Sequence, residues 1–445
     1  MIKTCAEEFK DWKTDVIIAT GTWPEVLHVT EKGNRARIPI LSLSTTQPLY
    51  LAPNPFLFRM SYSVSSYVHC LADLVKSHSW RRVIVLYEED NYGSISGSII
   101  PLLSNALQAV GSDIDHQSPF PPLESMDSLP ETTNMMRRKL KEINRRLCKV
   151  FIVVRWSSPS LALDLFKAAT ALGMMDKGNV WITGDDITNL VDSTFTPSFI
   201  SSYMQGVIGI RTTFNKSRKS YSDFHVQFQQ RFKSEYSESE ETNFEPGMYA
   251  LRAYDAVNVI AHVMNGDLNR SEGLLERIQS ANFLGLTGPV RFRRDGGLTN
   301  VKGSSAFQLI NFVGQSYKKM GFWVSGFGFF EGEEMDQSGP VAHSLDPVYW
   351  PGRPKKAPGG WGKLKIGVPA KAAFDQFVKV EYDDNKKMNV TGFCIDVFHE
   401  TLKWLEYDLS YELFPFNGSY DDLVASVPKV KFSIQRFHMF IPSWK

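Results

Sequence analysis

The sequence predicts an α/β protein made of doubly wound parallel sheets, and two observations support that prediction. Short apolar runs rich in β-branched residues recur along the chain, and each is typical of a strand buried on both faces of a sheet. Amphipathic helical segments lie between them, as expected where a crossover helix returns the chain to a parallel neighbour. The predicted strands are residues 16–19, 38–43, 83–87, 150–154, 180–183 and 207–210.

Two of the intervening segments place apolar residues at helical spacing. The first stripe is Met136, Leu140, Ile143 and Leu147, and the second is Ala162, Leu165, Ala169 and Leu172. The second helix also has end signals, because Ser158 is a suitable N-cap, Pro159 fits the first turn and Gly173 follows the last apolar residue. Basic residues of segment 137–146 form the outward face of the first helix, so a solvated face is favoured over a polyanion site.

The length of 445 residues suggests about three folding units. The alternation of strands and helices stops in a stretch rich in Pro and Ser near residues 115–130. We expect the first domain to have two lobes, and the chain to pass from one lobe to the other near residues 115–130 and again near 245–265. Residues 346–362 contain four Pro and four Gly and are predicted to be a linker between domain 1–345 and a second α/β unit at 363–427. The last 18 residues, 428–445, match no pattern of that unit, which we expect to be incomplete.

Composition and motifs exclude several function classes. Lys and Arg number 49 against 48 Asp and Glu, so the strong positive field that attracts nucleic acid is missing. The four cysteines form no CxxC pair, and we predict no metal site and no cofactor. The sequence contains no GxSxG, HExxH or Walker motif, and glycines 326, 328 and 332 have the wrong spacing for a dinucleotide loop. We therefore predict that the chain is not an enzyme and has no catalytic residues.

Membrane and secretion signals are also missing from the sequence. No apolar run approaches the roughly 18 to 20 residues that a membrane-spanning helix needs. Residues 1–13 mix charged and apolar side chains, unlike the apolar core of a signal peptide. Four glycosylation sequons would be usable only if the chain reaches the secretory pathway; they begin at Asn215, Asn269, Asn389 and Asn417.

Polar residues follow several of the predicted strands, at the ends where open α/β sheets bind ligands. The candidate ligand-binding residues are Ser44, Thr45, Thr46, Tyr87 and Asp185. Hydroxyls and free backbone N–H groups suit a carboxylate and Asp carboxylates suit an ammonium group, so together these positions fit a zwitterion such as an amino acid. The alternative is that strand-end Ser, Thr and Asp residues cap the helices that follow.

At these residues the sequence resembles plant glutamate receptor-like channels, a branch of the ionotropic glutamate receptor family. The resemblance to their amino-terminal domain rests on IPILSLSTTQP, NPFLFRMSYSVSSYVHCLADLVKSHSWRRVIVLYEEDNYG, VWITGDDITN and GFWVSGFG. A second set resembles the start of their glutamate-binding domain: VYWPG, KLKIGVPAKAAFDQFVKV, GFCIDVFHETLKWLEYDLSYELFPF and GSYDDLV. The resemblance extends over about 425 of the 445 residues, in the domain order of the family.

The resemblance implies a two-lobed type I periplasmic-binding-protein-like clamshell, as in natriuretic-peptide receptors, followed by part of a type II periplasmic-binding-like unit. It implies that a small zwitterionic ligand such as an amino acid binds between the lobes and that the chain is located on the extracellular side of the plasma membrane. It also implies homologous subunits as partners in a dimer or tetramer. Thr45 and Thr46 match the family's strand-end hydroxyls, Asp185 matches its strand-end acid, and segment 67–77 is the implied partner face.

The chain also departs from the family. Ala19, Thr20 and Gly21 stand where relatives typically have Gly-Pro-Gln, in the loop that also holds Thr22 and Trp23. The matched region opens without the family's first strand, helix and strand, and it stops before the ligand-clamping arginine, the pore and the membrane helices. We therefore expect a truncated ligand-binding and assembly region that is not a channel by itself; the alternative is a soluble amino-acid-binding carrier of the periplasmic-binding type.

Overall fold

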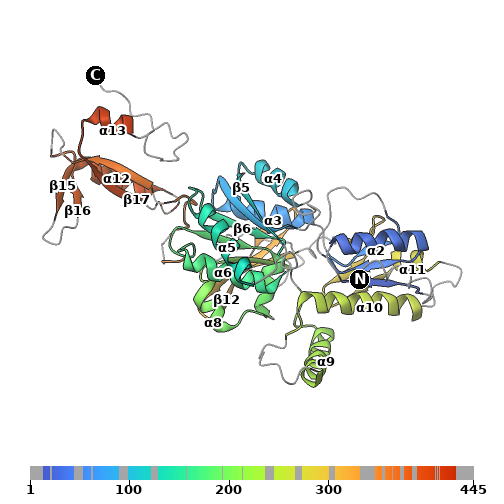
Figure 1. The fold of residues 1–445 in the computed structure, drawn as a ribbon. Coiled ribbons are helices and arrows are strands. Elements are labelled where there is room, and N and C mark those ends of the chain that lie inside the picture. Colours follow the sequence, from blue (N-terminus) through green and yellow to red (C-terminus); the bar gives the residue numbers. More distant parts are fainter. Residues whose placement is uncertain are drawn as a thin grey trace.

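A computed structural model describes the chain in three bodies: a first lobe, a larger second lobe and a second unit (Figure 1). The described residues are 14–20, 23–44, 54–61, 64–89, 99–121, 129–156, 158–192, 194–212, 214–235, 245–265, 273–299, 306–330, 345, 347–352, 356–362, 364–370, 375–382, 388–405, 407, 409 and 411–426.

The first lobe is assembled from two distant parts of the sequence. Its parallel sheet has the order β1 (Ile17–Ala19), β2 (Ile40–Ser42), β3 (Leu57–Arg59), with α2 (Trp23–Ala36) as the crossover. The second part supplies α10 (Met248–Asn265), α11 (Leu274–Gln279), β9 (Asn282–Leu284) and β10 (Pro289–Arg291). Leu41 and Phe58 of the sheet share one buried cluster with Ala256 and Val259 of α10 and Ile278 of α11. This shared core makes the two parts one lobe.

The second lobe is built on an eight-stranded sheet of order β13-β12-β11-β8-β7-β6-β4-β5. Five strands are parallel: β4 (Arg82–Glu88), β5 (Asp113–Phe120), β6 (Val150–Val154), β7 (Val180–Thr183) and β8 (Ile208–Thr212). Three more extend the sheet in antiparallel fashion: β11 (Ala306–Val313), β12 (Ser316–Val324) and β13 (Gly328–Phe330). The doubly wound α/β fold predicted from strand and helix alternation is therefore confirmed, with an antiparallel extension that the sequence pattern did not reveal.

Helices cover this sheet. They are α3 (Val64–Ser77), α4 (Ile99–Ala109), α5 (Leu129–Asn144), α6 (Pro159–Ala171), α7 (Asp185–Thr188), the 3-10 turn η2 (Asn189–Asp192) and α8 (Pro197–Tyr203). A further helix, α9 (Lys219–Glu235), contacts α10 through Tyr221, which packs on Leu251, and through Phe224, whose ring lies 4.8 Å from that of Tyr254.

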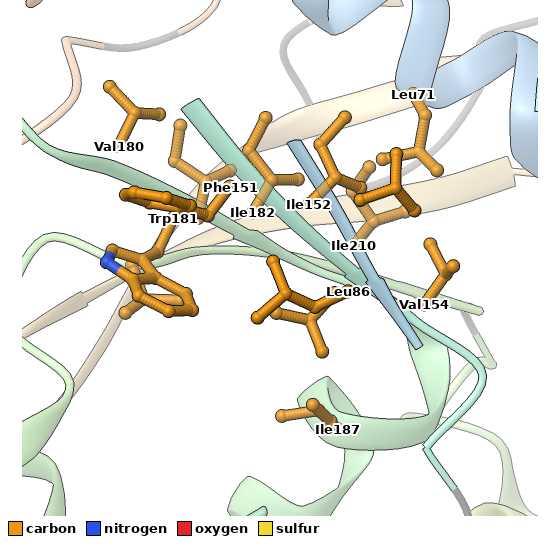
Figure 2. Packing of buried hydrophobic residues seen from close by; sticks show 14 of the residues in the cluster. Leu71, Leu86, Phe151, Ile152, Val154, Val180, Trp181, Ile182, Ile187 and Ile210 are labelled. Carbon is orange, nitrogen blue, oxygen red and sulfur yellow. The ribbon is translucent and has the colours of Figure 1, made fainter. Parts of the chain in front are cut away.

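The core of the second lobe explains why its central strands read as continuous apolar runs. All five residues of β6 and all four of β7 are buried, because helices lie on both faces of the sheet. Figure 2 shows Phe151, Ile152, Trp181 and Ile182 packed together in this core. The Trp181 ring lies 4.7 Å from that of Phe151, and its Nε1–H donates to the Met174 carbonyl at 2.8 Å.

The predicted ends of α6 match the structure. Ser158 is the N-cap and its hydroxyl accepts from the Leu161 N–H, Pro159 is the first helical residue, and Gly173 has a positive φ of 68° just past the helix. The predicted apolar stripe of this helix is buried at Ala162, Leu165 and Ala169.

The first change of lobe does not lie near residues 115–130. Strands β5 and β6, on the two sides of that segment, belong to the same sheet, and the chain changes sheet between β3 and β4. The polar composition of 113–120 reflects an edge strand, β5, whose side chains are mostly exposed or half-buried. The chain re-enters the first lobe at α10 and leaves it again between Thr299 and Ala306.

The second unit follows residues 347–362 and has little core among its described residues. It contains β14 (Leu364–Pro369), β15 (Lys379–Tyr382), β16 (Met388–Thr391), α12 (Phe393–Trp404), β17 (Tyr411–Phe416) and α13 (Tyr420–Ser426). Strands β14 and β17 pair in parallel, and β15 and β16 form an antiparallel pair. Val368 and Ile395 are its buried apolar side chains, whereas Phe393 and Trp404 are exposed. The tail 428–445 lies outside the described residues.

Within the described part of the chain, every helix is too short or too polar to span a bilayer.

Candidate functional site

A hollow lies at the carboxyl ends of β6, β7 and β8, where the second lobe faces α10 of the first. Its cavity volume is about 50 Å³, and it is partly open to solvent. Its lining residues come from both lobes: Ser61, Val64, Tyr67, Ile99, Arg155, Asp185, Asp186, Thr212, Arg252 and Phe307. The parallel strands of the second lobe have the order 2-1-3-4-5, and folds of that order bind ligands at this edge of the sheet.

Asp185 is the predicted site residue that lines the hollow. It begins α7 directly after β7, and its Oδ1 accepts from the Thr212 N–H at 2.5 Å. The N-cap of α7 is Gly184, so Asp185 is not the cap that the alternative interpretation required. A Cβ at Gly184 would meet the Tyr67 hydroxyl oxygen at 2.2 Å, so glycine is needed for this close approach.

Two guanidinium groups balance the two carboxylates of the hollow. An Arg252 Nη lies 3.6 Å from Asp185 Oδ2, and an Arg155 Nη lies 3.7 Å from Asp186 Oδ2. The Arg252 side chain is 4% exposed and that of Asp185 is 16% exposed, so their attraction is screened little by solvent. Because Arg252 lies on α10 and Asp185 on α7, this ion pair joins the first lobe to the second.

Tyr67 adds an uncommitted polar group to the hollow. Its hydroxyl is buried and has no hydrogen-bond partner among the described residues. Burial raises the pKa of Tyr67 well above its usual value, and the negative charges of Asp186 and Asp185 raise it further. The hydroxyl therefore stays protonated and is able to donate a hydrogen bond to a ligand oxygen.

The other predicted residues are distributed differently. Ser44 is buried outside the lining, and its carbonyl accepts from the hydroxyl of Ser61, which does line the hollow. Thr45, Thr46, Gly21 and Thr22 lie outside the described residues. Tyr87 is 3% exposed and packs in the core of the second lobe, outside the lining of the hollow, so its role in ligand binding stays a prediction.

The sequons have different environments. Asn389 lies exposed on β16, and Asn417 lies exposed between β17 and α13. Asn215 is half-buried, and its Oδ1 accepts from the Ser217 N–H at 2.8 Å. Asn269 lies outside the described residues.

Sequence reasoning missed Tyr67, Arg155, Thr212 and Arg252. Arg155 directly follows β6 and has a positive φ of 54°, and Thr212 ends β8, so the strand-end rule used for Asp185 would have found both. Tyr67 and Arg252 lie within helices and carry no local signal. The described residues contain no group of three or more His, Cys, Asp or Glu placed to hold a metal ion.

The fold is that of a receptor's ligand-binding portion. A family model described as "Receptor family ligand binding region" matches residues 3–315, and the chain belongs to this family. Two relatives from Arabidopsis thaliana are Glutamate receptor 2.5, 30% identical over 92% of this chain, and Glutamate receptor 2.7, 28% identical over 94% of it. The matches cover 46% and 45% of those relatives, so the chain spans a little under half their length.

Proposed function

We propose that this chain is the extracellular ligand-binding and assembly region of a glutamate receptor-like, ligand-gated cation channel at the plasma membrane. The observation that carries the proposal is the hollow between the lobes, where an acid–base pair, Asp185 and Arg252, connects the lobes across it. A ligand seated there contacts both lobes at once, and such contacts favour the closed arrangement of a hinged protein.

The charges of the hollow select the ligand class. Each carboxylate of the hollow is paired with one guanidinium group, and the N–O distances of the two pairs are 3.6 and 3.7 Å. Both distances are longer than a charge-assisted hydrogen bond. A zwitterion offers each of these charged side chains a closer partner. Its ammonium group pairs with Asp185, and its carboxylate accepts from Arg252 and from the Tyr67 hydroxyl. An amino acid is the simplest ligand with both groups.

Calorimetric titration of the full chain with a panel of L-amino acids tests this function. We expect saturable heat for at least one amino acid and a loss of at least about tenfold in affinity for Asp185→Asn, which removes the charge and keeps an acceptor for the Thr212 N–H. Asp164→Asn, on α6 and outside the hollow, is the matched control. No heat with any amino acid, or unchanged affinity in Asp185→Asn, would contradict the proposal.

A soluble amino-acid carrier is the second candidate, because every residue lining the hollow lies between Ser61 and Phe307 and none belongs to the second unit. A carrier binds its ligand without any response in the second unit. In a receptor region, ligand binding changes the position of that unit, and hydrogen exchange of β14 and β17 with and without ligand distinguishes the two.

Homologous subunits are the proposed partners in assembly, with segment 67–77 as the candidate partner face. Helix α3 belongs to the second lobe; half of its residues are buried, including Val68, Leu71 and Leu74 of the lobe's core, whereas His69 and Lys76 are exposed. Light scattering of the purified chain over a range of concentrations measures assembly directly. A monomer at every concentration would contradict the assembly role.

A further inference from the structure

Residues 347–352 and 356–362, the described part of the segment 346–362 that was predicted to be a linker, are seated on the second lobe. They lie at the amino ends of its parallel strands, and Trp350 is 5% exposed within the lobe's core cluster. The hollow lies at the opposite, carboxyl ends of the same strands.

An aromatic group holds one side of the segment. The ring of Trp350 lies 6.0 Å from that of Trp80 in an edge-to-face arrangement, and His78 stacks on Trp80 at 4.5 Å. The Trp80 Nε1–H donates to the Pro358 carbonyl at 2.7 Å. This bond satisfies a buried indole N–H, so the segment and the core stabilise each other.

Backbone contacts hold the carboxyl end of the segment. The Lys149 N–H donates to the Gly360 carbonyl at 2.8 Å, and the Gly362 N–H donates to the Leu147 carbonyl at 2.6 Å. These two bonds flank a bridge between Cys148 and Trp361 just before β6. Gly360 has a φ of +75°, and a Cβ there would lie 2.7 Å from a methyl carbon of Val150, so a larger residue cannot take its place without rearrangement.

The same segment also contacts the second unit. The Lys356 ammonium group donates to the Lys403 carbonyl at 3.0 Å and to the Leu405 carbonyl, at the C-terminal end of α12. A cation at this end satisfies free carbonyls and interacts favourably with the helix dipole.

We propose that residues 347–352 and 356–362, here called the coupler, form a rigid connection that makes the second unit move with the second lobe. One side of the coupler is fixed by Trp80 and the backbone bonds before β6, and the other is fixed by Lys356 on α12. A rotation of the second lobe relative to the first is thereby passed to the second unit as a rigid-body movement. The coupler acts in this way whichever ligand the hollow takes.

Distance measurement by double electron–electron resonance on the full chain tests the coupler. Spin labels are placed on Cys394, which is exposed on α12, and on Lys167→Cys, which is exposed on α6, in a Cys5→Ser background; Cys70 and Cys148 are buried. We expect one narrow distance distribution for this parent chain. Trp80→Phe, which keeps a ring and loses the bond to Pro358, and Lys356→Met, at an exposed residue, should each broaden it at least twofold.

Trp404→Phe is the matched control, because this tryptophan is 86% exposed and lies outside the coupler; its distribution should equal that of the parent chain. Circular dichroism melting curves show whether each variant folds. If Trp80→Phe does not fold, Lys356→Met still tests the proposal. A broad distribution in the parent chain, or no broadening in a folded variant, would overturn the proposal.

Discussion

Asp255 fixes the part of α10 that presents Arg252 to the hollow. Its carboxylate accepts from the N–H groups of Leu286 and Thr287 at 2.7 and 2.9 Å and from the Thr287 hydroxyl at 2.6 Å. Burial raises the pKa of Asp255, and the three hydrogen bonds oppose that rise by stabilising the carboxylate. Arg252 lies three residues earlier on the same helix, so this contact positions the first lobe's charge in the hollow.

Replacing Asp255 with Ala leaves two buried N–H groups without acceptors, and we expect the free energy of unfolding to fall by about 2 to 4 kcal/mol. Urea denaturation measures the change. Asp223→Ala on α9, an exposed position, is the control and should stay within about 0.5 kcal/mol of the parent chain. A loss equally small for Asp255→Ala would show that the contact does not hold α10.

His78 makes stability depend on pH. Burial lowers the pKa of His78, and a contact with the Leu74 carbonyl offsets this only in part. The unfolded chain therefore takes up a proton at about pH 6.5 and the folded chain only at lower pH, so the stability due to neutral His78 is present above that value and falls as pH drops below it. His78→Phe keeps a ring against Trp80 and should show a smaller loss of thermal stability between pH 7.5 and 5; equal losses would contradict this assignment.

At the scale of single elements, buried strands were predictable and edge strands were not. Strands β6 and β7 are apolar throughout because both faces are covered. Strand β5 carries Asp, His and Gln side chains at the edge of the sheet, and β12, next to the other edge strand β13, carries Lys318 and Lys319, so neither has the apolar run that the prediction relied on. Gly326, with a φ of 84°, lies in the turn between β12 and β13, and Gly328, with a φ of 85°, begins β13.

The N-cap of α6 gives an element-scale prediction. Ser158→Ala removes the acceptor for the Leu161 N–H and should lower the free energy of unfolding by about 1 kcal/mol. Ser222→Ala, on α9 and exposed, is the control and should have little effect. Denaturant titration of both variants checks this; an equally small loss for Ser158→Ala would contradict the capping role.

A substitution in the core of the second lobe's sheet should lower the free energy of unfolding by more. Trp181→Ala removes a ring that contacts Phe151 and Phe166, and it should cost about 3 to 5 kcal/mol through lost burial and the cavity that remains. Thermal or urea unfolding followed at the far-ultraviolet dichroism band provides the value. A cost below 1 kcal/mol would contradict this packing role of Trp181.

At the scale of the whole molecule, the lobes and their order along the chain were only partly predictable. The first lobe combines residues 17–59 with residues 248–291, and no local pattern shows that α10 returns to that sheet. The candidate site was likewise only partly predictable from the sequence. Asp185 was found because it follows a strand, whereas Arg252 reaches it from a helix 67 positions later in the sequence and from the other lobe.

The most direct test is the distance between the lobes as ligand is added. Spin labels at Glu31→Cys on α2 and Lys167→Cys on α6, both exposed, are used in a Cys5→Ser, Cys394→Ser background, with the amino acid that gives calorimetric heat. We predict that the distance shortens and saturates over the same concentration range as the heat, and that Asp185→Asn loses both responses together. Heat without any change in distance, or an unaltered response in Asp185→Asn, would show that the ligand does not bind between the lobes at this pair.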